Sequence, residues 1–122
     1  MEDDPLDDVE DEPVLVDEAV LERLRLFRQR ETKLALLPGV DVRAERARLT
    51  AVLDELVDRL LEGVVQHPSK RWVMSVFQRA LEQVETEDTE GRDHFGMELE
   101  TVMDILGIES SDGLLRFYLG GF

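Results

Sequence analysis

Cysteine is absent from the 122-residue chain, so the sequence excludes disulfide bonds and thiolate metal sites. The chain has two histidines, and aromatic residues make up 6% of it. It has no Gly-x-Ser-x-Gly elbow and no glycine-rich phosphate loop. No apolar run approaches the ~20 residues that a helix needs to cross a bilayer. These absences predict a protein that is not an enzyme, uses no cofactor and does not enter a membrane.

Basic residues are missing from the first 18 positions, where ten carboxylates stand together. Residues 19–81 then carry a net charge of +4, and residues 82–112 carry −10 with Arg92 as their one basic side chain. The formal net charge of the whole chain is −15 at pH 7. A block of like charges resists burial and attracts basic surfaces. Two acidic blocks around a basic middle therefore need an explanation beyond solubility.

Three interpretations of this charge pattern are open. In the first, an acidic face binds a basic protein, either a toxin or a nucleic-acid-binding protein. In the second, the acidic arm lies on the chain's own basic residues, namely Arg23, Arg25, Arg28, Arg30 and Lys33. In the third, the acidic blocks are only solvated. We favour the basic partner; the same field disfavours direct contact with nucleic acid or with anionic lipid, which it would repel.

Apolar residues recur with a helical period along most of the chain. They predict a first helix that starts after Asp17, runs through Leu34 and stops at Pro38-Gly39, and a second helix over about 42–65. A third helix should begin at Pro68-Ser69, with Trp72 on its buried face, and a fourth should span about 92–106. A short helix follows, with Leu114, Leu115, Phe117 and Tyr118. The pattern predicts an all-α fold, an antiparallel bundle of four main helices plus a short C-terminal helix.

Short polar residues mark the expected ends of these helices. Asp17 and Asp41 are placed to cap the first and second helices, and Ser110 or Ser111 to cap the last one. Gly107 suits a left-handed helix end, with Ile108 touching Met103 as in a Schellman motif.

The chain divides into an acidic arm, residues 1–16, and a single helical domain, residues 17–122. We expect the arm to be either flexible or pinned to the domain by Val14–Val16. The acidic N-terminus has neither the basic nor the apolar region of a signal peptide, so we expect a cytoplasmic protein.

The C-terminal string Met103-Asp-Ile-Leu-Gly-Ile-Glu-Ser-Ser-Asp-Gly-Leu-Leu115 is the most individual part of the sequence. With Pro68-Ser69-Lys70 and Glu87-Asp88-Thr89-Glu90, it resembles a family of small helical bacterial proteins, domain of unknown function 4844. The resemblance implies a helical fold and a bacterial source, and it brings no catalytic mechanism. The family tends to have Asn and Trp after Gly-Leu-Leu, where this chain has Arg116-Phe117, so no side-chain role is carried over to those positions.

A metal site is the one enzymatic alternative. Glu90, His94 and Glu98 share one face of the expected fourth helix and offer divalent-ion ligands. Their Glu-x-x-x-His spacing departs from the Glu-x-x-His of di-iron bundles and occurs once, so we favour a solvated helix face.

The sequence therefore predicts a non-enzymatic protein that binds and neutralises a basic partner, as an immunity protein blocks a bacterial toxin. The expected partner-binding carboxylates are Glu85, Glu87, Asp88, Glu90 and Asp93 on the domain and Asp3, Asp4, Asp7 and Asp8 on the arm. The alternative is a small structural or regulatory bundle, possibly a homodimer, whose acidic arm is solubilising or autoinhibitory.

Overall fold

A computed structural model describes residues 4–30, 34 and 42–120. Five α-helices follow one another there: α1 Glu18–Gln29, α2 Val42–Gly63, α3 Lys70–Gln83, α4 Thr89–Leu106 and α5 Leu114–Leu119. A 3₁₀ helix, η1 Pro5–Asp8, precedes them, and the described residues contain no strand. The all-α prediction is confirmed. Within the described part, none of the helices combines the length and the apolar character that crossing a membrane requires.

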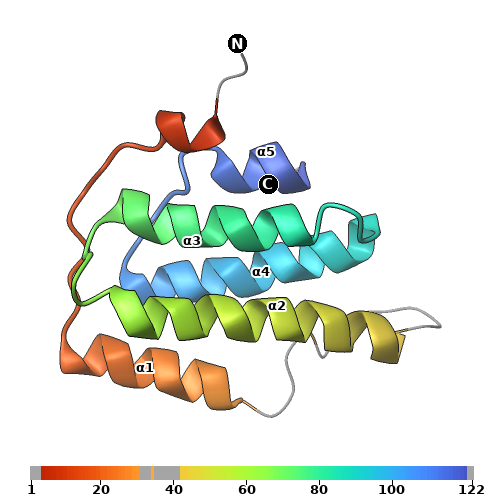
Figure 1. Ribbon diagram of the computed structural model, residues 1–122, viewed down its shortest axis with the longest axis horizontal. Coiled ribbons are helices and arrows are strands. Elements are labelled where there is room, and N and C mark those ends of the chain that lie inside the picture. Colours follow the sequence, from red (N-terminus) through yellow and green to blue (C-terminus); the bar gives the residue numbers. More distant parts are fainter. Residues whose placement is uncertain (1–3, 31–33, 35–41, 121–122) are drawn as a thin grey trace.

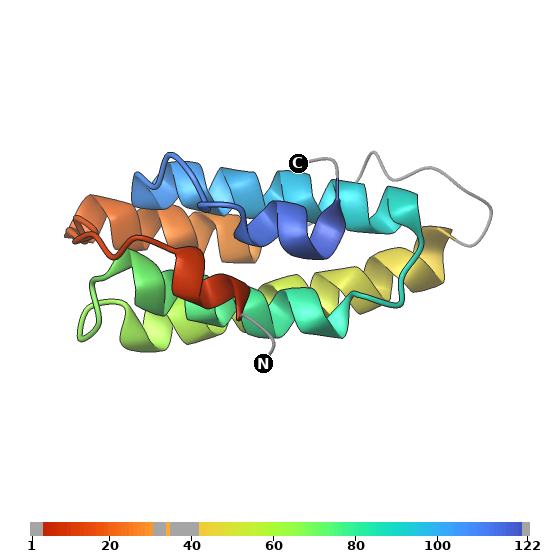
Figure 2. The ribbon, with the colours of Figure 1, turned by 90° about the horizontal axis from the view of Figure 1, so that it is seen from above.

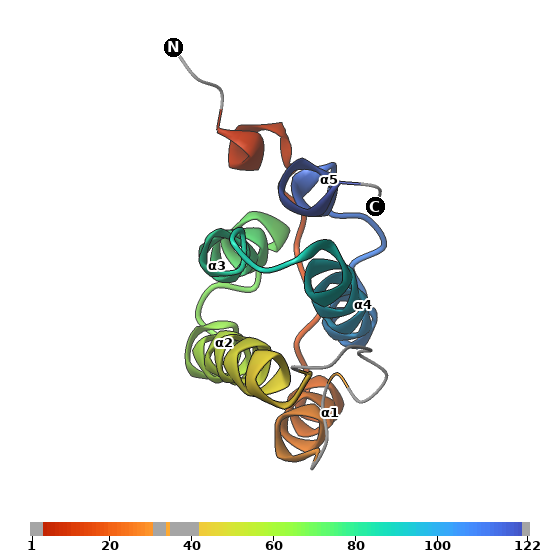
Figure 3. The same cartoon turned by 90° about the vertical axis from the view of Figure 1, so that its right-hand side faces the viewer.

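The four long helices form a bundle in which consecutive helices run in opposite directions (Figure 1). In the end-on view of Figure 3, α1 and α2 form one pair, and α3 and α4 lie between that pair and α5. The interior is filled by leucine, valine and phenylalanine side chains from all four helices, including Leu24, Leu53, Phe77, Phe95 and Leu99. Burial of these apolar faces stabilises the bundle, because short isolated helices are marginal in water.

Capping side chains fix where several helices begin and end. Asp17 accepts the Val20 N–H at 2.9 Å and caps α1, as predicted. Ser69 accepts the Trp72 N–H at 3.1 Å and caps α3. Gly107 ends α4 with φ 72°. The Ile108 N–H donates to the Met103 carbonyl at 2.9 Å, which is the predicted Schellman bond.

The first helix is shorter than predicted. It ends at Gln29, and Leu34 lies outside it with φ 60°. A right-handed helix does not pass through that backbone conformation. Leu34 is nevertheless buried, and its carbonyl accepts a hydrogen bond from Arg46 Nε of α2 at 3.2 Å. The predicted stop at Pro38-Gly39 and the predicted cap Asp41 lie outside the described residues.

Two other helix starts differ from the predictions. Helix α4 begins at Thr89, earlier than 92, because Asp88 caps it by accepting the Gly91 N–H at 2.8 Å. The N-cap of α5 is Gly113, with φ 91°, in place of a serine. Ser111 still contributes, because its Oγ accepts the Leu115 N–H at 3.3 Å.

The acidic arm packs on the bundle along residues 4–14. Figure 2 shows η1 and α5 side by side over the other helices. Val9 is 1% exposed, and Val14, in the segment expected to pin the arm, is also buried. The Val14 N–H donates to the Pro68 carbonyl at 2.9 Å, and the Lys70 N–H donates to the Glu12 carbonyl at 2.8 Å. These contacts make the described part of the arm a component of the folded structure.

Candidate functional site

The carboxylates that the sequence placed at a partner-binding surface fall into several environments. In the second acidic block, Glu87 pairs with Arg48 of α2 through two contacts, at 2.9 and 3.1 Å. Its side chain is only 15% exposed. Asp88 is occupied as the cap of α4. These two carboxylates join helices within the protein, so a partner meets them only at the cost of those contacts.

The remaining predicted carboxylates of this block are more open. Glu85 and Glu90 are exposed and Asp93 is partly exposed. In the candidate metal set, His94 Nδ1 lies 2.9 Å from the Glu90 carbonyl, and the Glu98 carboxylate pairs with Arg30, which directly follows α1. No group of three metal-binding side chains occurs among the residues that the structure describes.

Two hydrogen bonds hold the carboxylate of Asp4 in the arm. Its Oδ1 accepts the Leu6 N–H at 3.0 Å and the Gln78 Nε2 amide of α3 at 2.7 Å. These hydrogen bonds lower the pKa of Asp4, the one from Leu6 most strongly, and keep the carboxylate charged. Asp7 and Asp8 are exposed on η1, and Asp3 lies outside the described residues.

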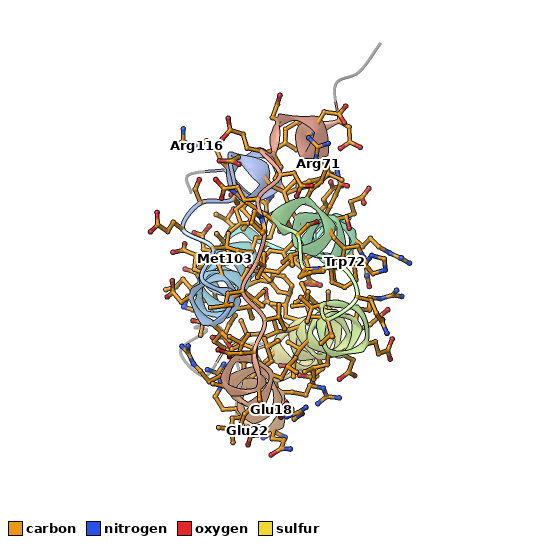
Figure 4. The ribbon with its side chains drawn as sticks, turned by 90° about the vertical axis from the view of Figure 1, so that its left-hand side faces the viewer. Glu18, Glu22, Arg71, Trp72, Met103 and Arg116 are labelled. Atoms are coloured by element: carbon orange, nitrogen blue, oxygen red, sulfur yellow. The ribbon has the colours of Figure 1, made fainter. Side chains whose placement is uncertain are left out.

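The arm meets its own basic residues at a different place from the one considered in the sequence. The Arg71 N–H donates to Asp11 Oδ1 at 3.1 Å, and Arg71 Nη2 donates to the Val9 carbonyl at 2.9 Å. Arg25 and Arg28 of α1 pair instead with carboxylates of α1 and α2, namely Glu18, Glu22, Asp54 and Asp58. Figure 4 shows that Arg71 lies at the end of the fold opposite Glu18 and Glu22.

Asp4 and Glu85, one from each acidic block, line the same hollow. This acidic groove has a volume of about 460 Å³ and lies between η1, α3 and α5. It is lined by Asp4, Pro5, Gln78, Glu82, Glu85, Phe117 and Tyr118. Among the described residues, no lysine or arginine lines it. The fold therefore brings together carboxylates that are 81 positions apart in the sequence, and it presents them around two aromatic rings.

The groove contains five residues that the sequence did not assign to a site, namely Pro5, Gln78, Glu82, Phe117 and Tyr118. Gln78 and Glu82 are four positions apart on α3 and so share one helical face. Tyr118 OH accepts Gln78 Nε2 at 3.1 Å, which ties α5 to α3. Phe117, predicted to lie in the short last helix, is 62% exposed. The helical spacing of Gln78 and Glu82 was visible in the sequence, but nothing there placed α5 beside them.

A second hollow of about 490 Å³ lies at the other end of α3 and is lined by Asp11, Glu12, Pro13, His67, Pro68, Ser69 and Trp72. Its aromatic wall is already engaged, because the Trp72 ring stacks on His67 with centroids 5.4 Å apart. A Cβ built on Gly63 of α2 would lie 2.5 Å from Trp72 Cζ2, so the ring also packs closely on α2 (Figure 4). Trp72 is thus a packing residue, and the acidic groove is the better candidate site.

Comparison with known proteins supports the family resemblance. Searches of curated proteins and of solved structures find no match to this chain. A family model matches residues 16–122, which include all five α-helices and most of the groove and begin where the acidic arm ends. The chain therefore belongs to the family described as Domain of unknown function (DUF4844).

Proposed function

We propose that this protein is a non-enzymatic interaction protein that binds and neutralises a basic protein partner, as an immunity protein blocks a bacterial toxin. Charge would steer the two proteins together, and the bound chain would cover the active site of its partner. The observation that carries the proposal is the convergence of Asp4 and Glu85 on one groove. The arm and the domain then contribute to a single acidic surface.

The exposure and contacts of the carboxylates support some of them for this role more than others. Glu85, Glu82 and Asp4 are exposed around the groove, and Asp7 and Asp8 extend the acidic surface along η1. Glu87 and Asp88 are held by Arg48 and by the start of α4. We therefore centre the proposed partner surface on the groove, and we leave Glu87 and Asp88 as structural carboxylates.

The alternative function is a structural or regulatory bundle, and one observation favours it. The described part of the arm is tied to its own domain by Val9, Lys70 and Arg71. An arm with that role would stabilise the bundle, or cover the ends of α3 and α5, with no external partner. A homodimer is a further form of this alternative, and the oligomeric state in solution tests it.

The two functions are separated by affinity capture. The full chain is immobilised and exposed to lysate of the source cells at about 0.05 M and 0.5 M salt, because screening weakens exposed charge contacts at the higher value. We expect a basic protein to be retained at low salt and released at high salt. The retained protein is then purified, and its own activity is measured with and without the chain.

A matched pair of variants completes the test. Asp4→Asn combined with Glu85→Gln should slow association with the purified partner, whereas Glu22→Gln, on α1 at the far end of the fold, should not. Loss of the partner's activity on binding supports neutralisation. If no basic protein is retained, or if the association rate does not change with salt concentration, the structural or regulatory bundle is favoured.

A further inference from the structure

The acidic groove combines carboxylates with an aromatic ring that the fold leaves uncovered. Phe117 is 62% exposed, whereas its neighbours Leu114, Leu115 and Leu119 are buried. Its ring meets the Tyr118 ring edge-on, with centroids 5.0 Å apart and planes at 74°. Exposing a phenyl ring at the lip of a hollow has a hydrophobic cost that a bound ligand would remove.

The carboxylates act on one small region. Burial is the main cause of the raised pKa of the Tyr118 hydroxyl, and the charges of Glu82, Asp4 and Glu85 raise it further. Asp4 just before η1, Glu82 of α3 and Glu85 after α3 line the same groove as Tyr118. Among the described residues, no basic side chain lines the groove. The negative field of these three carboxylates therefore acts on any group that enters the groove.

We infer that the acidic groove binds an arginine side chain, with the guanidinium on the Phe117 ring and its N–H edge toward Glu82 and Glu85. This inference rests on the proposed function, because it names the chemistry by which a basic partner is recognised. The ring face attracts a cation electrostatically. A planar guanidinium stacks on a ring while it donates hydrogen bonds in its own plane. The lysine ammonium is more strongly hydrated and lacks that planar edge, so arginine suits this wall better.

The test uses isotope-labelled full-length chain and a small probe, N-acetyl-arginine amide, followed by NMR at low salt. The chain has one tyrosine, so the Tyr118 ring signals are unambiguous. We expect saturable shifts at Phe117, Tyr118 and the Gln78 side-chain amide, with weaker binding of N-acetyl-lysine amide. The citrulline analogue, which keeps the shape and loses the charge, should not bind. Equal binding of arginine and lysine, binding of citrulline, or no saturable shift would overturn the inference.

Variants at exposed positions check the two parts of the groove. Phe117→Leu keeps an apolar side chain and should weaken binding about two- to fivefold, the size of an exposed cation–π contact, whereas Phe117→Tyr should retain it. Glu82→Gln with Glu85→Gln should weaken it about three- to tenfold. Glu22→Gln, which removes a charge on α1, is the control and should have no effect. Unchanged affinity in Phe117→Leu would contradict the role of the ring.

The outcomes for the groove and for the proposed function are distinguishable. If a basic partner is bound in a salt-dependent way but the Phe117 and Glu82/Glu85 variants bind it normally, the groove inference fails and the proposed function stands. If the arginine probe binds in the groove but no basic protein is retained by the full chain, the proposed function fails and the groove assignment stands.

Discussion

The carboxyl group of Glu45, on α2, lies against the carboxylate of Asp88 at the start of α4. Glu45 is only 9% exposed, and its Oε1 is buried without a hydrogen-bond partner in the charged form. When protonated, the Glu45 carboxyl donates to Asp88. Burial most strongly raises the pKa of Glu45, and this hydrogen bond raises it further. The backbone N–H of Gly91 most strongly lowers the pKa of Asp88.

This pair predicts opposite pH effects on stability. Since folding raises the pKa of Glu45, its contribution is full below the ordinary Glu value of 4.5 and is lost as pH rises through the folded value. The contribution of Asp88 is present above its ordinary value of 3.8 and is lost as pH falls through its lowered folded value. Urea unfolding at a series of pH values measures both. Glu45→Gln keeps a donor for Asp88 and does not titrate, so it should abolish the loss on the alkaline side. An unchanged pH profile in that variant would contradict the raised pKa of Glu45.

Gly91→Ala should destabilise the protein because a Cβ at this position would overlap Glu45 Oε1. The overlapped atom is the end of a flexible side chain and can shift, so the loss should lie at the lower end of the about 1–3 kcal/mol that overpacking costs. The control is the double variant Gly91→Ala with Glu45→Ala, which removes the overlapping group. Its loss should be smaller than the sum of the two single losses in urea unfolding, because the residues are in contact. Additive losses would show that the two residues do not interact.

Lys70→Met should loosen the arm from α3. Lys70 is 5% exposed, and its Nζ lies 2.8 Å from Asp112 Oδ2, which also accepts the Glu10 N–H at 3.0 Å. Methionine retains the apolar stem and leaves Asp112 without its cation, a change that costs about 1–3 kcal/mol. Unfolding in urea measures the loss. Lys70→Met combined with Asp112→Asn should cost less than the sum of both single changes, whereas Arg59→Met, on the exposed side of α2, should be nearly neutral.

Val9→Ala tests whether the arm belongs to the folded core. Removing two methyl groups from a side chain that is 1% exposed should cost about 1–2 kcal/mol. Hydrogen exchange should accelerate at the Val14 amide, which donates to Pro68. Leu15→Ala, at the exposed position next to Val14, is the control. It should change neither the stability nor the exchange rate of the Val14 amide. A neutral Val9→Ala would mean that the arm contributes little to stability.

Much of the fold was predictable because its signals are local. The 3.6-residue apolar period located all five α-helices, and single residues such as Asp17 and Gly107 set helix ends through their own backbone and side-chain chemistry. Prediction failed where a distant contact prevailed over the local pattern. Leu34 continues the apolar period of the first helix, yet it leaves that helix and is bonded by Arg46 of α2.

Composition and short-range spacing were enough to predict the helical class and the two blocks of negative charge, and similarity of sequence gave the family. The role of each carboxylate depends on packing between distant segments. Glu87 and Glu85 are two positions apart, but the first is held by Arg48 of α2 while the second opens on the groove with Asp4. The charge of a carboxylate follows from the sequence. Whether that charge is paired or left exposed depends on neighbours that come from segments far away in the sequence. The acidic surface is therefore a product of packing between η1, α3 and α5.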